Sequence, residues 1–318
     1  MSKATKAFWC CPLCGEALLA KAATWCCEQG HSFDRAKQGY VNLLPVQKKQ
    51  SLDPGDNQQM IDARHHFLRA GHYAPLAQLL SQSVQKYLSD IDVNTAGTES
   101  SHVNNKAVRY ILDLGCGEGY YLETALSYLS ECDLSVSEAA ASGVAGSTIS
   151  APTINAPTIS AYGIDISKAA VKRAASTFKA ASFAVASSYD IPLGGEHVDI
   201  AFSVFSPIKT GELSRVLSKN GYFIRALPGP RHLYQLKELL YADVKLHELP
   251  KTLNDFELCE EQSLNFELQL DKREDIEKFL TMTPLNWHKN VSARESLLLN
   301  PKLNVECDFL IHCYRPIV

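Results

Sequence analysis

The chain has 318 residues and a formal net charge of −4, with 46% hydrophobic and 21% charged residues. This composition is ordinary for a globular protein, and the length suggests two domains or one large domain with an appendage. No apolar run reaches the roughly 18 residues that a membrane-spanning helix needs, so we expect no membrane contact. An acidic chain is not a typical nucleic-acid binder, so any such contact must come from a local patch.

Four candidate metal ligands lie close together near the start of the chain. Cys11 and Cys14 are separated by Pro-Leu, and Cys27 and His31 are separated by three residues. Two ligand pairs at this spacing are typical of a closed structural zinc site. A disulfide framework and a redox Cys-x2-Cys are the alternatives. Residues 1–7 lack the apolar core of a signal peptide, so we expect a cytoplasmic chain with reduced thiols, which favours zinc. Cys10 and Cys26, each beside a proposed ligand, leave the register open.

Residues 1–40 are predicted to form this zinc-binding domain, with Phe33, Tyr40 and Val41 as its small apolar support. A module of this size cannot bury a core, so the metal should supply most of its folding energy. We therefore expect loss of the metal to unfold residues 8–40 while the rest of the chain, with its own apolar core, stays folded.

Residues 41–107 read as a connector and a helical segment. Pro45, Pro54 and Gly55 indicate an extended stretch over 41–57. Apolar spacing predicts a helix over 58–68 that Gly71 ends, then a second helix over about 73–88 and a polar loop over 89–107. The segment is also basic. We expect it to supply the local patch for nucleic acid, through Lys48, Lys49, Arg64 and Arg69; a solvated helix face is the alternative.

From residue 108 the pattern becomes an alternation of strands and helices, which predicts an α/β fold with a parallel sheet covered by helices on both faces. The predicted strands are 108–114, 160–164, 182–186, 198–204 and 222–227. The predicted helices are 120–129, 167–178 with Ser167 as cap, 211–217 and 232–241. The tail should add antiparallel strands over 256–270 and 304–314 around a helix at 273–282, giving seven strands in a domain that spans 108–318.

Residues 132–159 interrupt this alternation. They are rich in Ala, Ser, Thr and Pro and contain a short tandem repeat that starts at Ile149 and again at Ile154. Such a composition does not build a packed core. We expect a mobile surface insertion that is dispensable for stability and activity.

The glycine loop is the second strong motif. Gly115, Gly117 and Gly119 follow a predicted strand and precede a predicted helix, with Asp113 just before them. The third glycine comes one residue too early for the dinucleotide pattern, and Asp165 ends the next strand, where it can accept ribose hydroxyls. This form resembles the first motif of class I S-adenosylmethionine-dependent methyltransferases. A dehydrogenase and a purely structural turn are the alternatives.

Two later segments fit the same kind of enzyme. Ser187 lies in the Ala186–Leu193 stretch, where such enzymes enclose the adenine, although many carry an Asp at that position. Phe205-Ser206-Pro207 follows the fourth strand, where many members place substrate-facing residues; a plain strand-ending turn is the alternative.

Several longer strings resemble one family, the bacterial 23S rRNA (guanine-N1)-methyltransferases. The resemblance covers the chain apart from 93–107 and 132–159. The strings that carry it are Cys11-Pro-Leu-Cys14, His31-Ser-Phe-Asp34, Gly39-Tyr-Val-Asn-Leu-Leu-Pro45, Asp53-Pro-Gly-Asp56, Ala70-Gly-His-Tyr73, Leu114-Gly-Cys-Gly-Glu-Gly-Tyr-Tyr121 and Pro228-Gly-Pro-Arg-His-Leu233.

This resemblance implies a Rossmann-like class I methyltransferase core behind a zinc-binding domain, acting as a homodimer. It implies methyl transfer from S-adenosylmethionine to N1 of a guanine in a 23S rRNA hairpin. It further implies zinc ligation by Cys11, Cys14, Cys27 and His31, which resolves the register. The implied cofactor contacts are Tyr73, Gly117, Glu118 and His232.

Guanine N1 carries a proton at neutral pH, so a base or water must remove it. The candidates are Asp190, His232 and Glu118, and His232 could instead only cap the cofactor pocket. The guanine must also be unstacked, and aromatic side chains can receive it. The available aromatics are Tyr120, Tyr121, Phe205 and Tyr234. A small-molecule methyltransferase and a non-enzymatic RNA-binding protein are the rival functions.

Overall fold

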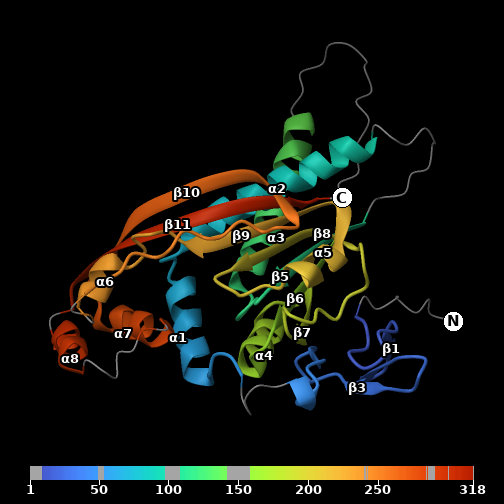
Figure 1. The fold of residues 1–318 in the computed structure, drawn as a ribbon, viewed down its shortest axis with the longest axis horizontal. Coiled ribbons are helices and arrows are strands. Elements are labelled where there is room, and N and C mark those ends of the chain that lie inside the picture. The colour runs from blue at the N-terminus through green and yellow to red at the C-terminus, as the bar shows by residue number, and fades with distance from the viewer. Residues whose placement is uncertain are drawn as a thin grey trace, which may run out of the picture.

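The computed structural model describes residues 9–48, 54–96, 108–141, 158–239, 241, 243–283, 285, 291–299 and 301–317. An N-terminal three-stranded antiparallel sheet comes first, built from β1 (Leu19–Lys21), β2 (Thr24–Cys26) and β3 (Ser32–Asp34). The larger sheet follows, and Figure 1 shows the small sheet beside its β7 end. The division into 1–40, 41–107 and 108–318 stays a prediction.

The larger sheet has eight strands in the order β10-β11-β9-β8-β5-β6-β7-β4. Strands β4 through β9 run parallel to their neighbours, whereas β11 is antiparallel to both β9 and β10. The strands are β4 (Val41–Asn42), β5 (Val108–Leu114), β6 (Thr158–Asp165), β7 (Ala181–Val185), β8 (Val198–Val204), β9 (Leu217–Pro228), β10 (Phe256–Leu270) and β11 (Leu303–Pro316).

The prediction of seven strands therefore misses one. Val41 and Asn42 of the presumed connector pair in parallel with Ala184 and Val185 of β7. A two-residue strand has too little sequence pattern to be recognised, because alternation needs about four residues to show. Its pairing partner is remote in sequence and known only from the fold.

Eight α-helices accompany the described strands. They are α1 (Gln58–Arg69), α2 (Ala74–Ala96), α3 (Tyr120–Ala141), α4 (Lys168–Thr177), α5 (Thr210–Val216), α6 (Tyr234–Glu238), α7 (Arg273–Met282) and α8 (Val291–Leu299). The side chain of Ser167 accepts a hydrogen bond from the Ala170 amide, which confirms it as the N-cap of α4.

Several helix boundaries differ from the prediction. Helix α2 continues to Ala96 through a stretch assigned as loop, and α3 continues to Ala141 through the first part of the predicted insertion. In neither stretch does the sequence show the apolar periodicity on which the helix predictions rested. Residues 142–157 of the insertion lie outside the described residues. Helix α8 was not predicted.

The sheet is buried on both faces, and different elements cover each. Ile111 packs in a cluster with residues of α1, α2, α3, α4 and α7. Leu112 and Leu114, which point the opposite way along β5, pack in a second cluster with α5 and the N-terminal module. Adjacent residues of a strand face opposite sides, so each side needs its own cover. Beside α5, a zinc module rather than a further helix covers part of this second face.

Trp9 is the main contact between the module and the sheet. Its side chain is 2% exposed, and its ring meets Tyr162 of β6 edge to face at 5.3 Å. The Cys10 amide also donates to the Pro192 carbonyl at 2.8 Å. The module and the sheet share one apolar cluster, so loss of the module would also remove contacts of the sheet. The expectation that the rest of the chain stays folded without the metal remains a prediction.

We predict that Trp9→Ala lowers the free energy of unfolding of the whole chain by about 3–5 kcal/mol, since it empties a fully buried indole site. Urea unfolding followed by tryptophan fluorescence and circular dichroism measures this. Leu13→Ala is the matched control, because Leu13 lies in the same module and is 58% exposed. A Trp9→Ala chain as stable as the control would show that the module contributes little to the core.

Candidate functional site

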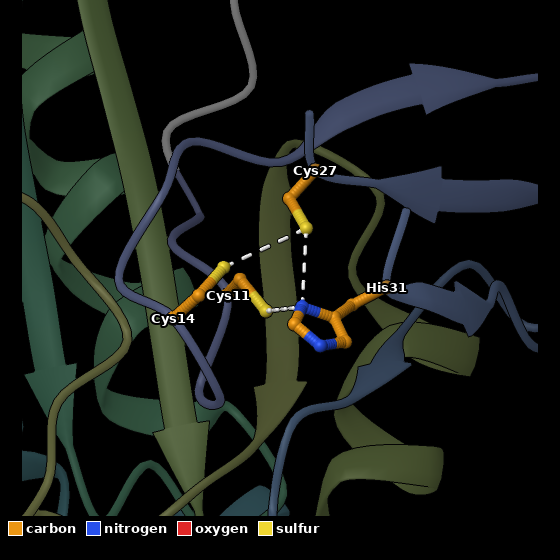
Figure 2. A group of neighbouring side chains, drawn as sticks. All are labelled: Cys11, Cys14, Cys27 and His31. Atoms are coloured by element: carbon orange, nitrogen blue, oxygen red, sulfur yellow. Dashed lines mark hydrogen bonds between the residues drawn. The ribbon is translucent and has the colours of Figure 1, made fainter. Parts of the chain in front are cut away.

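The four predicted zinc ligands converge on one point. Figure 2 shows Cys11, Cys14, Cys27 and His31 facing each other from two turns, and their ligand atoms all lie within 4.8 Å of one another. Cys11 Sγ lies 3.6 Å and Cys27 Sγ 3.4 Å from His31 Nδ1, and Cys14 Sγ lies 3.6 Å from Cys27 Sγ. Bonds of about 2.0–2.3 Å to a tetrahedral zinc require ligand separations of about 3.5–3.8 Å. These contacts match the edges of a zinc coordination shell, so the residues fit the metal.

Local backbone geometry explains how the ligands are held. The Gly15 amide donates to the Cys11 carbonyl, and the Gly30 amide donates to the Cys27 carbonyl. Both glycines have left-handed φ angles, 78° and 84°, which other residues rarely adopt. Each turn thus folds back over one pair of ligands. Two neighbouring cysteines lie outside the group. Cys26 Sγ lies 3.4 Å from Ser32 Oγ, and the backbone of Cys10 forms an isolated β-bridge with Ala17. This confirms the predicted choice of ligands.

The glycine loop joins the end of β5 to the start of α3. Gly115, Gly117 and Gly119 have φ angles of 76°, 53° and 88°. A Cβ on Gly115 would collide with Ser206, and one on Gly119 would press on Ala174, but a Cβ on Gly117 would meet nothing within 4 Å. The first and third glycines therefore allow close packing. Gly117 faces open space at the switch point between β5 and β8, where ligands of such sheets bind.

Asp165 fixes the loop from the neighbouring strand. Its Oδ2 accepts the Gly117 amide at 2.9 Å, and its Oδ1 accepts the Ser167 amide at 2.7 Å. Burial raises the pKa of Asp165, and these two N–H donors oppose the rise. The carboxylate is thus oriented at the carboxyl end of β6, as a ribose-binding residue requires.

Two further carboxyl groups surround the same loop. Asp113 is 2% exposed and its Oδ2 has no hydrogen-bond partner in the described part of the chain. Burial, and secondarily the charge of Asp165, raise the pKa of Asp113 well above its usual range. Glu118 is 1% exposed, and its Oε2 lies 2.6 Å from His65 Nδ1. Burial favours the neutral form of Asp113, whereas hydrogen bonds to Glu118 and Asp165 favour their ionised forms, and negative charge at the loop would attract a cationic ligand and repel a phosphate.

An aromatic and histidine cluster follows β8 and β9. The His232 ring lies 4.6 Å from Phe309, 5.9 Å from Phe205 and 6.5 Å from Tyr73, measured between ring centroids. His232 is 8% exposed, and burial is the main reason why its pKa falls to about 3, so the ring is neutral at neutral pH. The structure therefore brings Tyr73 and His232 together, as the resemblance implies.

Phe205 is the exposed member of this cluster. Its side chain is 42% exposed and its φ of 56° is left-handed, a strained conformation that often marks a functional position. Tyr120 is buried, and Tyr234 lies beneath the Arg231 guanidinium at 4.8 Å. Of the aromatic side chains proposed to receive the unstacked guanine, Phe205 is exposed and also lies beside His232.

Ser187 and Asp190 lie together in the turn after β7. The Ser187 hydroxyl accepts the Tyr189 amide at 3.1 Å, and the Asp190 amide donates to the Ser187 carbonyl. The next residue, Ser188, donates to the Pro207 carbonyl at 2.8 Å and so ties this turn to the end of β8. Both predicted residues therefore lie at the same edge of the sheet as the glycine loop.

Sequence reasoning missed the partners of these residues. His65 and Arg69 of α1 face Glu118, and Lys237 Nζ lies 2.6 Å from His247 Nε2 beside His232. The sequence around a helical histidine does not indicate which remote residue its side chain will contact. These contacts became visible only in the fold.

The basic connector is largely paired within the chain. Arg64 forms an ion pair with Asp56, Arg69 with Glu123, and His66 Nε2 lies 3.0 Å from Asp275 Oδ1. The side chain of Lys48 and all of Lys49 lie outside the described residues. The cations of α1 therefore already balance acidic groups of the core.

Comparison with known proteins agrees with this geometry. Residues 9–52 match the zinc-ribbon family model described as "RlmA, N-terminal". The "23S rRNA (guanine(748)-N(1))-methyltransferase" of Streptomyces fradiae is 30% identical over 289 residues, which cover 88% of this chain and 86% of that protein. The "Putative 23S rRNA (guanine-N(1)-)-methyltransferase YxjB" of Bacillus subtilis (strain 168) is 28% identical, with 95% of each chain covered.

The chain belongs to the 23S rRNA (guanine-N1)-methyltransferase family. It is therefore an enzyme, as predicted, and the zinc ribbon is part of the family's architecture. Among solved structures, YcgJ of Bacillus subtilis covers 68% of this chain and 95% of its own, with 14% identity and a TM-score of 0.39, a likeness too distant to add to the assignment. Within the described residues, no helix is long and apolar enough to cross a membrane.

In this methyltransferase, we predict that Cys14→Ser abolishes stoichiometric zinc binding, because a closed site needs all four ligands. Since the module shares a core with the sheet, the midpoint of thermal unfolding should fall as well. Metal analysis by mass spectrometry and differential scanning calorimetry measure the two effects. Cys26→Ser is the matched control, a neighbouring cysteine outside the ligand group. Full zinc content in Cys14→Ser would overturn the ligand assignment.

Proposed function

We propose that the enzyme transfers a methyl group from S-adenosylmethionine to N1 of a guanine in a hairpin of 23S rRNA. The choice of S-adenosylmethionine as methyl donor rests on three acidic residues around an open glycine loop, Asp113, Glu118 and Asp165. S-adenosylmethionine is cationic at its sulfonium and amino groups, whereas a dinucleotide would bring a pyrophosphate into the same field. The guanine and the rRNA are supported by the printed names of the relatives.

The cofactor-binding residues follow from this placement. Asp165 accepts the ribose hydroxyls, Gly117 lets the ligand approach the backbone while Gly115 and Gly119 let the loop pack closely, and Glu118 supplies negative charge beside the buried Asp113. Ser187 borders the adenine, and Tyr73 and His232 close the pocket from the side of β9. When bound, the donor supplies an electrophilic methyl group. The chain itself orients that group and excludes water.

Proton removal from N1 needs a separate group. Burial holds the pKa of His232 at about 3, because a proton would turn this enclosed ring into a buried cation, whereas a carboxylate becomes neutral when it accepts a proton. Glu118 is enclosed and already bonded to His65. We therefore propose Asp190 as the base and Phe205 as the surface on which the unstacked guanine rests.

Incubation of the protein with labelled S-adenosylmethionine and either 23S rRNA or a hairpin fragment tests the proposal. Label in RNA, with a primer-extension stop at one guanine, is the expected result. Label in a small molecule from a cell extract, with none in RNA, would favour the rival small-molecule methyltransferase. We also propose that the enzyme is cytoplasmic and works as a homodimer, as the family resemblance implies; sedimentation velocity tests the assembly.

We predict that Asp165→Ala weakens S-adenosylmethionine binding about tenfold to a hundredfold, because charge-assisted hydrogen bonds to the ribose are lost at a cost of roughly 1.5–3 kcal/mol. Isothermal titration calorimetry measures the affinity. Asp271→Ala, an exposed aspartate after β10, controls for a general loss of charge. Unchanged affinity in a folded Asp165→Ala protein would place the ribose elsewhere.

Asp190→Asn should lower kcat by about a hundredfold or more, the usual contribution of a general base, with little change in donor affinity. The matched variant Asp34→Asn lies in the zinc module and should leave kcat unaltered. A normal kcat for Asp190→Asn would exclude Asp190 as the base.

A further inference from the structure

A histidine of α1 meets the glycine loop through a buried carboxyl group. His65 Nδ1 and Glu118 Oε2 are 2.6 Å apart, although the two residues are 53 positions apart in sequence. The Glu118 side chain is fully enclosed, whereas that of His65 is 29% exposed. The contact therefore joins a partly exposed helix face to the interior of the loop.

The contact with His65 favours the ionised form of Glu118. Burial raises its pKa, and the hydrogen bond and charge of His65 are the largest effects that oppose the rise. Its other oxygen, Oε1, has no hydrogen-bond partner within the described residues, and Arg69 Nε lies 3.9 Å from it. Without His65, no hydrogen bond to the carboxylate would remain in the described contacts.

Other groups that act on Glu118 come from three elements. Besides His65, α1 contributes Arg69, whose charge lowers the pKa of Glu118, while Glu123 of α3 raises it. The remaining titratable neighbours that sense its charge are Cys116 of the loop and Tyr120 and Tyr121 of α3. Arg69 is itself engaged by Glu123, so it does not replace His65.

The loop is thus held from two sides. Asp165 of β6 binds the Gly117 amide, and His65 of α1 binds the side chain of the next residue, Glu118. Gly117 is the glycine that faces open space. A displacement of Glu118 is therefore expected to move the adjacent Gly117 backbone, which the ligand approaches.

We propose that His65 is a positioning residue for the methyl donor, which it serves by keeping Glu118 ionised and in place beside Gly117. The proposal rests on the proposed function, because it takes S-adenosylmethionine as the ligand of the loop. It assigns α1, a helix outside the glycine motif, a direct part in donor binding.

The test compares His65→Ala with His66→Ala by calorimetric titration with S-adenosylmethionine. His66 is the matched control, because it is the next residue of α1 and pairs with Asp275 of α7 instead. We expect His65→Ala to weaken donor binding about tenfold near neutral pH, the lower end of the effect of losing a hydrogen bond to a charged group. His66→Ala should stay within about twofold of the unaltered chain.

The pH profile separates positioning from simple loss of structure. The pKa of Glu118 is raised, so its charge, and with it donor binding, is lost as the pH falls through that pKa. His65→Ala removes an opposing effect, so this acidic limb should move to higher pH. His65→Asn, which keeps an N–H donor at the place of Nδ1, should recover part of the affinity and move the limb less.

Two results would overturn the proposal. One is donor binding by His65→Ala that equals the unaltered chain at every pH. The other is a uniform loss of affinity with no movement of the acidic limb, in His65→Ala or, if that variant does not fold, in His65→Asn. Failure of the unaltered chain to bind S-adenosylmethionine at all would instead overturn the proposed function itself, and this inference with it.

Discussion

A parallel sheet has to be covered on both faces, and this requirement organises the whole molecule. Along β5, Ile111 points to one side and Leu112 and Leu114 to the other. Helices cover the first side. On the second side, α5 and the zinc module share the task, with Trp9 packed on Tyr162. We therefore expect metal binding to contribute to the stability of the sheet, because Cys11 and Cys27 lie in the same apolar cluster as Trp9.

The same sheet positions the proposed donor site at its carboxyl edge. The crossover from β5 to β6 lets Asp165 reach back to Gly117, and the return to β8 places Ser206 against Gly115. Charge then separates the ligand classes that could use such a loop. The carboxylates of Glu118 and Asp165, whose hydrogen bonds oppose the effect of burial on their charge, disfavour a phosphate and favour a cation. The geometry of the loop and its electrostatics thus support the same donor.

The pairing of the α1 cations changes how the basic connector is understood. Arg69 lies near both Glu118 and Glu123, so its positive charge acts on carboxyl groups at the glycine loop and is not free for RNA alone. Arg64 is paired with Asp56 in the same way. Neutralising Arg69 would disturb the proposed donor site together with any RNA contact, so substitution at this position cannot separate the two roles. An RNA interface is better sought with variants outside α1.

Local patterns were sufficient for much of this protein. The spacing of the cysteines and His31 predicted a zinc site, and the family resemblance chose Cys11, Cys14 and Cys27 over the neighbouring Cys10 and Cys26. The glycine loop, Asp165 and most of the strands were also evident, since each is encoded by neighbouring residues. What the sequence could not determine were contacts between remote segments. The eighth strand, the burial of Trp9 on β6, the His65–Glu118 pair and the low pKa of His232 all arise from burial and pairing over long separations. Only the tertiary structure decides such features, because a residue's solvation and partners depend on which remote segments fold against it.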